Sequence, residues 1–182
     1  MKLCILGNGL TSLCLAKSLI NKGIHVDIFL NQKKLDNDKT RTIGISKKNL
    51  DFFNKEILNI EKFLWNINKI HIYSDNLKNE KILNFQNKNH PLFAIVKNHQ
   101  LYKFLSLNLK KSKLCKFKIN KKFTELDINN YNLIINCDSK NYLSKKFFFK
   151  KFKKKYNSYA YTTIIKHKKI RNDIAYQIFT KR

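Results

Sequence analysis

The sequence has 182 residues, of which 38 are Lys or Arg and 12 are Asp or Glu, so its formal net charge is +26. This length fits one domain, or one domain and part of a second, and it is enough to bury a sizeable core. Such a charge ordinarily suggests nucleic acid or an anionic membrane as partner. The heavy use of Lys, Asn, Ile, Phe and Tyr, however, favours an AT-rich coding bias that places charge on solvated faces. We therefore do not expect nucleic-acid binding to be the main function.

The cysteines and histidines give no sign of a metal site. The four cysteines, at positions 4, 14, 115 and 137, lack Cys-x-x-Cys spacing, and the five histidines lack ligand spacing. Because Cys4 and Cys137 fall inside apolar runs, we predict free thiols in a reducing compartment. No uncharged run approaches the roughly 18 residues of a spanning helix, which predicts a cytoplasmic protein.

The first thirty residues predict a strand, a glycine turn, a helix and a second strand. Residues 3–6 are apolar, a helical pattern covers residues 13–22, and residues 24–30 form another apolar run. Gly23 stands where a left-handed residue would end the helix. This βαβ order is typical of the unit that opens a dinucleotide-binding sheet.

The turn itself has the chemistry of a phosphate site. Gly7 permits a tight turn, and Gly9 has no side chain to keep a pyrophosphate away from the backbone. Ser12 takes the third small position, where it allows the helix to pack close to the strand. At the end of the second strand, Leu30 and Asn31 replace the acidic residue that usually holds the ribose. An ordinary glycine turn is the alternative interpretation.

The next segments predict an extended stretch and an amphipathic helix. Residues 41–46 are extended, and Ser46 then caps a helix whose apolar face includes Leu50, Phe53 and Ile57. Arg41 can reach a phosphate or a flavin edge, or it can be a surface cation. In so lysine-rich a chain the use of Arg favours the first interpretation.

Two further patterns follow. Residues 70–73 and 82–85 predict a hairpin that turns at Asp75 and Asn76. Residues 92–96 are extended, and Asn98 then opens a helix with one apolar face, formed by Leu101, Phe104, Leu105 and Leu109.

The last third of the sequence predicts mostly strands. Residues 117–119 and 123–126 have the pattern of short strands, and residues 133–137 form a buried strand that ends at Asp138. Alternation over residues 159–165 and 175–179 predicts two more. We expect the strands at 3–6, 24–30 and 133–137 to be parallel neighbours. We expect those at 70–73, 82–85, 159–165 and 175–179 to form a separate, mostly antiparallel sheet.

A lysine-rich and aromatic run covers residues 145–156. Basic and aromatic residues in alternation can bind nucleic acid or an anionic membrane surface. The favoured alternative is a solvated connection whose Phe residues pack onto the core.

Four segments, in this order, resemble the flavin-dependent aromatic hydroxylases: GNGLTS (7–12), RTIGIS (41–46), LFAIVKNHQL (92–101) and YNLIINCD (131–138). Within that family the likeness is to the ubiquinone-biosynthesis branch, the 2-polyprenylphenol hydroxylases. Asn98 and Leu101 match that branch's helix opening, and residues 175–180 are similar to its substrate-domain sheet. The resemblance covers the whole chain but only about the N-terminal half of a family member.

The resemblance implies an α/β fold: a Rossmann-like FAD-binding βαβ sheet and part of a mostly antiparallel β substrate domain. Residues 1–67 and 92–145 would form the FAD-binding domain, and residues 68–91 and 146–182 the partial substrate sheet.

The cofactor-binding residues would be Gly7, Gly9 and Ser12, with Arg41 and Asn98 towards the pyrophosphate and ribityl chain. Asp138 matches the Asp of the family's Asp-Gly motif, although Ser139 replaces the glycine. The resemblance names no catalytic residue, because the flavin carries the chemistry.

By resemblance the function is hydroxylation of the aromatic ring of a polyprenylated ubiquinone precursor. FAD would be the cofactor, NADPH or another donor would supply electrons, and contact with the inner membrane or a biosynthetic complex would be peripheral. Because the family's later Gly-Asp segment is missing, we expect the chain alone to bind FAD weakly or not at all and to hydroxylate nothing. A non-catalytic remnant and a basic binding module remain alternatives.

Overall fold

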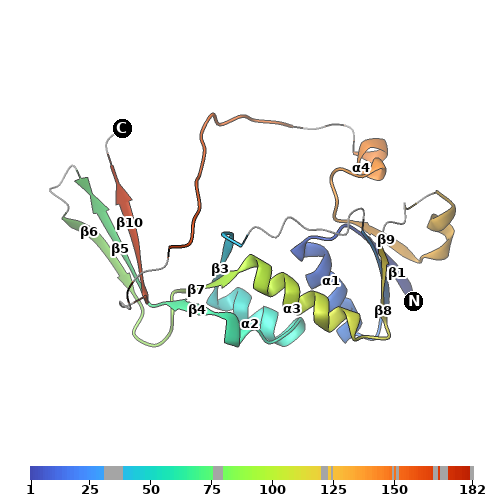
Figure 1. Cartoon of the computed structure of the whole chain (residues 1–182), viewed down its shortest axis with the longest axis horizontal. Helices are drawn as coiled ribbons and strands as arrows, with labels where there is room; N and C mark the ends of the chain where they lie inside the picture. The colour runs from blue at the N-terminus through green and yellow to red at the C-terminus, as the bar shows by residue number, and fades with distance from the viewer. Residues whose placement is uncertain are drawn as a thin grey trace.

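The computed structural model of the protein describes residues 1–30, 39–75, 80–119, 123, 125–148, 150, 152–165, 168 and 172–180. Figure 1 shows three sheets along the molecule. A four-stranded sheet lies at one end, a three-stranded sheet at the other, and a second three-stranded sheet between them. None of the helices in this described part has the length and apolar character that a membrane crossing demands.

The four-stranded sheet has the order β8-β2-β1-β9, and all its pairs are parallel. Its strands are β1 (Lys2–Leu6), β2 (His25–Leu30), β8 (Cys115–Ile119) and β9 (Leu133–Asn136). Leu3 of β1 is paired with Val26 on one side and with Leu133 on the other. The prediction that these three segments are parallel neighbours is therefore confirmed.

Helix α1 (Leu10–Asn21) connects β1 to β2 and begins three residues earlier than predicted. It ends as expected, because Gly23 has a φ of +76° and donates its backbone N–H to the Ile20 carbonyl at 2.9 Å. A residue with a side chain is strained in this left-handed conformation, which explains the glycine.

Alternating side chains give the parallel sheet two buried faces. On one face Ile5 and Ile28 share a core with α1 and with α3 (Asn98–Lys110). On the other face Cys4 and Phe29 share a smaller core with Leu143 of α4 (Tyr142–Phe147). The sheet is thus covered on both sides, as parallel sheets generally are.

The middle sheet is antiparallel, with the order β3-β7-β4. It contains β3 (Thr42–Ser46), β7 (Phe93–Lys97) and β4 (Trp65–Ile67). The predicted cap of α2 (Lys47–Glu56) is confirmed, because Ser46 Oγ accepts the Asn49 backbone N–H at 3.4 Å. A short 3₁₀ helix, η1 (Glu61–Phe63), leads into β4.

The third sheet has the order β10-β5-β6. Strands β5 (Lys69–Ser74) and β6 (Lys81–Gln86) pair antiparallel, which confirms the hairpin, although residues 76–79 of its turn lie outside the described residues. Strand β10 (Ile174–Phe179) joins the sheet as expected but pairs parallel to β5.

Two strand predictions are wrong. Residues 159–165 are in no strand, because the alternating run pairs with neither edge of the β10-β5-β6 sheet. The predicted strand at 123–126 is not formed by its described residues, 123, 125 and 126. Phe123 packs edge-on against Phe29 with ring centres 5.1 Å apart, and the 3₁₀ helix η3 begins at Glu125, in a stretch where Asp and Asn favour turns.

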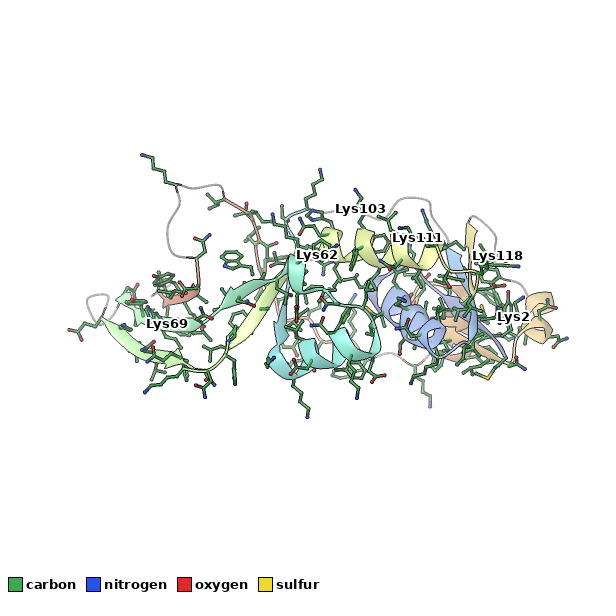
Figure 2. All side chains as sticks on the ribbon, turned by 90° about the horizontal axis from the view of Figure 1, so that it is seen from below. Lys2, Lys62, Lys69, Lys103, Lys111 and Lys118 are labelled. Atoms are coloured by element: carbon green, nitrogen blue, oxygen red, sulfur yellow. The ribbon has the colours of Figure 1, made fainter. Side chains whose placement is uncertain are left out.

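The described part of the basic and aromatic run (145–148, 150 and 152–156) is solvated, but Phe147, Phe148 and Phe152 do not pack onto the core. The exposed fractions of Phe147, Phe148 and Phe152 are 59%, 65% and 94%. Lysines are also distributed over the rest of the molecule, since the labelled examples in Figure 2 lie along its whole length.

Candidate functional site

The candidate site lies at the carboxyl edge of the parallel sheet. Strand β1 leads into Gly7 there, and β9 leads into Cys137 and Asp138. In the strand order β8-β2-β1-β9 the chain order reverses between β1 and β9, so the two strands flank a topological switch point. Open α/β sheets bind ligands at such a switch point, outside the carboxyl ends of the strands.

Gly7 is fixed by close contacts with its neighbours. Its φ is +122°, and a Cβ at this position would lie 3.1 Å from the Cys137 carbonyl carbon and 3.1 Å from Ser12 Oγ. Its backbone N–H also donates to the Phe29 carbonyl at 3.1 Å. The turn therefore needs glycine for conformation and for space, which brings Gly7, Ser12 and Cys137 together.

Gly9 has a different reason to be glycine. Its φ and ψ are −76° and 174°, which any residue adopts, and a Cβ on it would meet nothing within 4 Å. The space above the start of α1 is therefore open. A glycine that the fold does not require is consistent with the close approach of a ligand to the backbone.

The helices differ in how their N-termini are satisfied. Ser46 caps α2 and Asn141 caps α4 through side-chain oxygens. Helices α1 and α3 have no side-chain cap, and neither has an acidic residue in its first turn. An uncapped N-terminus presents free N–H groups and a partial positive charge, which is the ordinary arrangement for binding phosphate.

Ser12 supplies a further polar group at the turn. The residue is completely buried, yet its Oγ has no hydrogen-bond partner among the described atoms. Buried hydroxyl groups without a partner are rare in folded proteins. The open Gly9, the uncapped α1 and the unpaired Ser12 Oγ together fit a pyrophosphate-containing group such as that of FAD.

Arg41 and Asn98 form a second group of predicted residues. The backbone N–H of Asn98, the first residue of α3, donates to the Arg41 carbonyl at 3.0 Å. Arg41 itself is exposed. The prediction did not include His99, whose Nδ1 is buried without a partner among the described atoms. A polar residue in the first turn of an uncapped helix was the available signal.

The turn from Gly7 to Ser12 and the pair of Arg41 and Asn98 are connected through the core. Leu13 of α1 and Leu101 of α3 are each the fourth residue of their helix, and both belong to the same buried cluster. Figure 1 shows these two helices side by side. The structure thus places two uncapped helices in one layer against the parallel sheet.

Asp138 organises its own turn after β9. Its backbone N–H donates to Asn136 Oδ1 at 3.0 Å, and its Oδ1 accepts the Lys140 backbone N–H at 2.9 Å. Ser144 Oγ donates to its carbonyl at 2.9 Å. Ser139 has a negative φ, so this turn does not need the glycine of the family motif.

Two of the cysteine thiols are poorly suited to act as nucleophiles. Burial raises the pKa of the Cys14 thiol from 9.0 to about 11. Burial, and then the charge of Asp27, raise the pKa of Cys115 to about 11 as well. These thiols are therefore protonated and poor nucleophiles at neutral pH. Within the described ranges, no three His, Cys, Asp or Glu side chains are grouped to hold a metal ion.

The position at the end of β2 that usually holds the ribose is occupied by an apolar residue. Leu30 is buried at the end of β2, and Asn31 lies outside the described residues. The six predicted cofactor residues (Gly7, Gly9, Ser12, Arg41, Asn98 and Asp138) accordingly remain predictions.

Several solved structures match the fold of this chain, and some of them are named for a monooxygenase or for FAD. No protein-family model and no curated protein matches the sequence. The p-nitrophenol 4-monooxygenase PnpA of Pseudomonas putida is 14% identical with a TM-score of 0.55, over 65% of this chain and 31% of that one. HpxO of Klebsiella pneumoniae, in complex with FAD and uric acid, is 15% identical with a TM-score of 0.52, over 65% and 31%.

PqsL of Pseudomonas aeruginosa, named as a probable FAD-dependent monooxygenase, matches a larger share of the chain. It is 10% identical with a TM-score of 0.60, over 84% of this chain and 46% of that one. The chain thus spans between about a third and about a half of the length of these structures. It has the mixed α/β fold, with a Rossmann-like parallel sheet, of the part of these structures that it covers.

Proposed function

We propose that this chain is the FAD-binding part of a flavin-dependent monooxygenase. The observation that carries the proposal is the start of α1, where Gly9 leaves the backbone open and no side chain occupies the helix N-terminus. The shared fold with PnpA, HpxO and PqsL supports it.

Each residue of the site has a defined part. The backbone around Gly7 and Gly9 and the N-terminus of α1 hold the pyrophosphate, and Ser12 Oγ donates its hydrogen bond towards the same group. Arg41, beside the N-terminus of α3, offers a positive charge to a second phosphate oxygen or to the ribityl chain. Bound FAD supplies the redox and oxygen chemistry, while the protein places the ring and excludes water.

The substrate belongs to the proposal as well. The motifs at 7–12, 41–46, 92–101 and 131–138 resemble the ubiquinone branch, so we infer a polyprenylated phenol as the ring that is hydroxylated. NADPH or another donor supplies electrons. Because the chain spans less than half of PqsL, turnover requires parts of the monooxygenase fold that this chain does not contain.

The proposal is tested by titrating the purified chain with FAD and following flavin fluorescence. We expect weak binding, because Leu30 cannot make the charge-assisted hydrogen bond of about 1.5–3 kcal/mol that an acid makes with the ribose. NADPH consumption should not be coupled to hydroxylation. No FAD binding at millimolar concentration would rule out the cofactor, and stoichiometric FAD with coupled hydroxylation would show the chain to be a complete enzyme.

Gly9→Ala is the matched variant, because its backbone conformation and open surroundings accept a methyl group. We expect unchanged thermal stability and FAD binding weakened about ten-fold or more, since one lost hydrogen bond to a phosphate costs about 1.5–3 kcal/mol. Equal FAD affinity in the variant and the wild type would place the cofactor elsewhere.

A further inference from the structure

A cavity of about 290 Å³ lies at the amino edge of the parallel sheet, at the other end of the strands from Gly7. Lys2 and Gly7 are five residues apart on an extended strand, so the two edges are separated by about 16 Å. The described residues that line the cavity come from the strand starts and from the turns before them: Met1, Lys2, His25, Asp27, Lys113, Leu114, Lys116 and Asn132. It is therefore distinct from the proposed FAD site.

The strand register places charged and polar side chains on one face of the sheet at this edge. In the pairing of β1 with β2, Lys2 lies opposite His25. Asp27, two residues further along β2, lies opposite Lys116 of β8. Because side chains alternate along a strand, these four lie on the same face. Further along that face lies the smaller apolar core, so the polar groups at its edge depart from the local pattern, as residues of functional sites often do.

Asp27 and its partners form a fixed side of the cavity. The residue is 3% exposed, its carboxylate accepts a hydrogen bond from Tyr131 Oη at 2.8 Å, and it lies 3.3 Å from Lys2 Nζ. Lys2 is held at its backbone as well, because its N–H donates to Asn132 Oδ1 at 2.8 Å. The carboxylate is thus already neutralised, and it positions one ammonium group beside the cavity.

Two more ammonium groups come from the β8 side of the cavity. Lys113 and Lys116 are both exposed, and both line it. The turn that carries Lys113 is fixed, because the Val26 backbone N–H donates to the Leu114 carbonyl at 2.8 Å. Among the described lining residues, three lysines are balanced by a single carboxylate, that of Asp27. This excess of positive charge favours an anionic ligand.

The type of cation indicates the type of anion. Arginine, whose planar fork matches a carboxylate, does not occur among the described lining residues. Lysine ammonium groups act as point charges on flexible stems, so several of them can bind the oxygens of one phosphate from different sides. A ring nitrogen of His25 and the amide NH₂ of Asn132 can add hydrogen bonds.

We propose that this cavity binds a small molecule through a phosphate group. Lys2, Lys113 and Lys116 hold the phosphate oxygens, and Asp27 keeps Lys2 in position. The proposal is independent of the proposed function, because none of the six predicted FAD residues lines the cavity.

The test is calorimetry on the purified full chain at physiological salt, with inorganic phosphate and glycerol 3-phosphate as probes. The first represents a free anion and the second a phosphate ester, so the tighter of the two identifies the source. We expect the Lys113→Gln/Lys116→Gln variant to bind the tighter probe about five- to thirty-fold more weakly, as the loss of two exposed ion pairs predicts. Lys2 stays in place because it also neutralises Asp27.

The matched control is Lys110→Gln/Lys111→Gln. It removes the same charge from exposed residues that do not line the cavity, and Lys111 lies in the same part of the molecule as Lys2 (Figure 2). It should lose less than about two-fold in affinity. Because all four lysines are exposed, both variants should unfold at nearly the wild-type temperature when no ligand is present.

Four results would overturn the proposal. No binding of either probe at about 10 mM would show that the cavity takes no phosphate. Equal losses in the two lysine variants would show only general charge attraction. Citrate that binds as tightly as the phosphate probes would show a site for any anion. Phosphate binding that is lost in Gly9→Ala but kept in Lys113→Gln/Lys116→Gln would place the anion at the FAD turn. If FAD fails to bind while phosphate binding follows the lysine variants, the proposed function fails and this site stands.

Discussion

At the scale of single residues, two glycines in one turn have different physical roles. We expect Gly7→Ala to lower the free energy of unfolding by about 1–3 kcal/mol, because a φ of +122° is strained for alanine and its Cβ would press on Cys137. Urea denaturation measures the loss, and Gly9→Ala is the control that should show none. A Gly7→Ala protein as stable as the wild type would mean that the turn has another backbone conformation.

Asp27 is a buried charge whose partner the sequence does not reveal. It is 3% exposed, accepts a hydrogen bond from Tyr131 Oη at 2.8 Å, and lies 3.3 Å from Lys2 Nζ. Local patterning places Asp27 in an apolar strand, but Tyr131 is 104 residues away, so only the assembled sheet brings them together. Periodicity carries no information on such a contact.

Tyr131→Phe tests this hydrogen bond. Removing a donor from a buried carboxylate costs about 1.5–3 kcal/mol, so the midpoint of urea unfolding should fall accordingly. The control is Tyr142→Phe, which removes a hydroxyl group from a more exposed ring. Equal midpoints for Tyr131→Phe and the wild type would show that Lys2 alone satisfies Asp27.

The thiols predict a dependence of stability on alkaline pH. The pKa values of Cys14 and Cys115 are about 11 in the folded protein and 9.0 in their ordinary state, so the folded chain keeps these protons longer. Their contribution to the free energy of unfolding is complete below pH 9 and is lost as the pH rises towards about 11. The Cys14→Ala/Cys115→Ala variant should lose less stability over this range in denaturation measurements. Parallel curves for the variant and the wild type would contradict the assignment.

At the scale of elements, the sequence was informative where local rules decide the structure. The βαβ unit, the Ser46 cap and the Gly23 helix end all follow from neighbouring residues, and the structure has them. The pairing of strands that are distant in the sequence was harder to predict. No local feature of the sequence distinguishes residues 174–179 from residues 159–165. The first segment pairs with β5, whereas the second forms no strand.

The same distinction holds for the candidate site. Gly7 could be placed in the turn from the sequence, because its backbone conformation restricts the residue type, whereas Gly9 and Ser12 were predicted from their spacing in the motif. The network of Asn136, Asn141 and Ser144 could not, because polar residues after a strand have the composition of any turn.

At the scale of the whole molecule, the parallel sheet and the β10-β5-β6 sheet differ in how well they are covered. Both faces of the first are buried under helices and aromatic rings. In the second, Leu83, Phe85 and Ile178 are about half exposed, at 49%, 48% and 60%. Within the described residues, β6 and β10 are edge strands with one neighbour each. A three-stranded sheet with uncovered apolar side chains is marginally stable and prone to association.

We therefore expect the isolated chain to self-associate through the β10-β5-β6 sheet. Sedimentation velocity should show species larger than a monomer, and a dye specific for apolar surface should bind strongly. The Phe85→Lys/Ile178→Lys variant should shift the protein towards monomer and reduce dye binding, because it places charge on both edge strands. Phe52→Lys/Phe147→Lys, which alters equally exposed rings outside this sheet, is the control and should leave association unchanged. A monomeric wild type that binds no dye would show that these side chains are covered by another part of the chain.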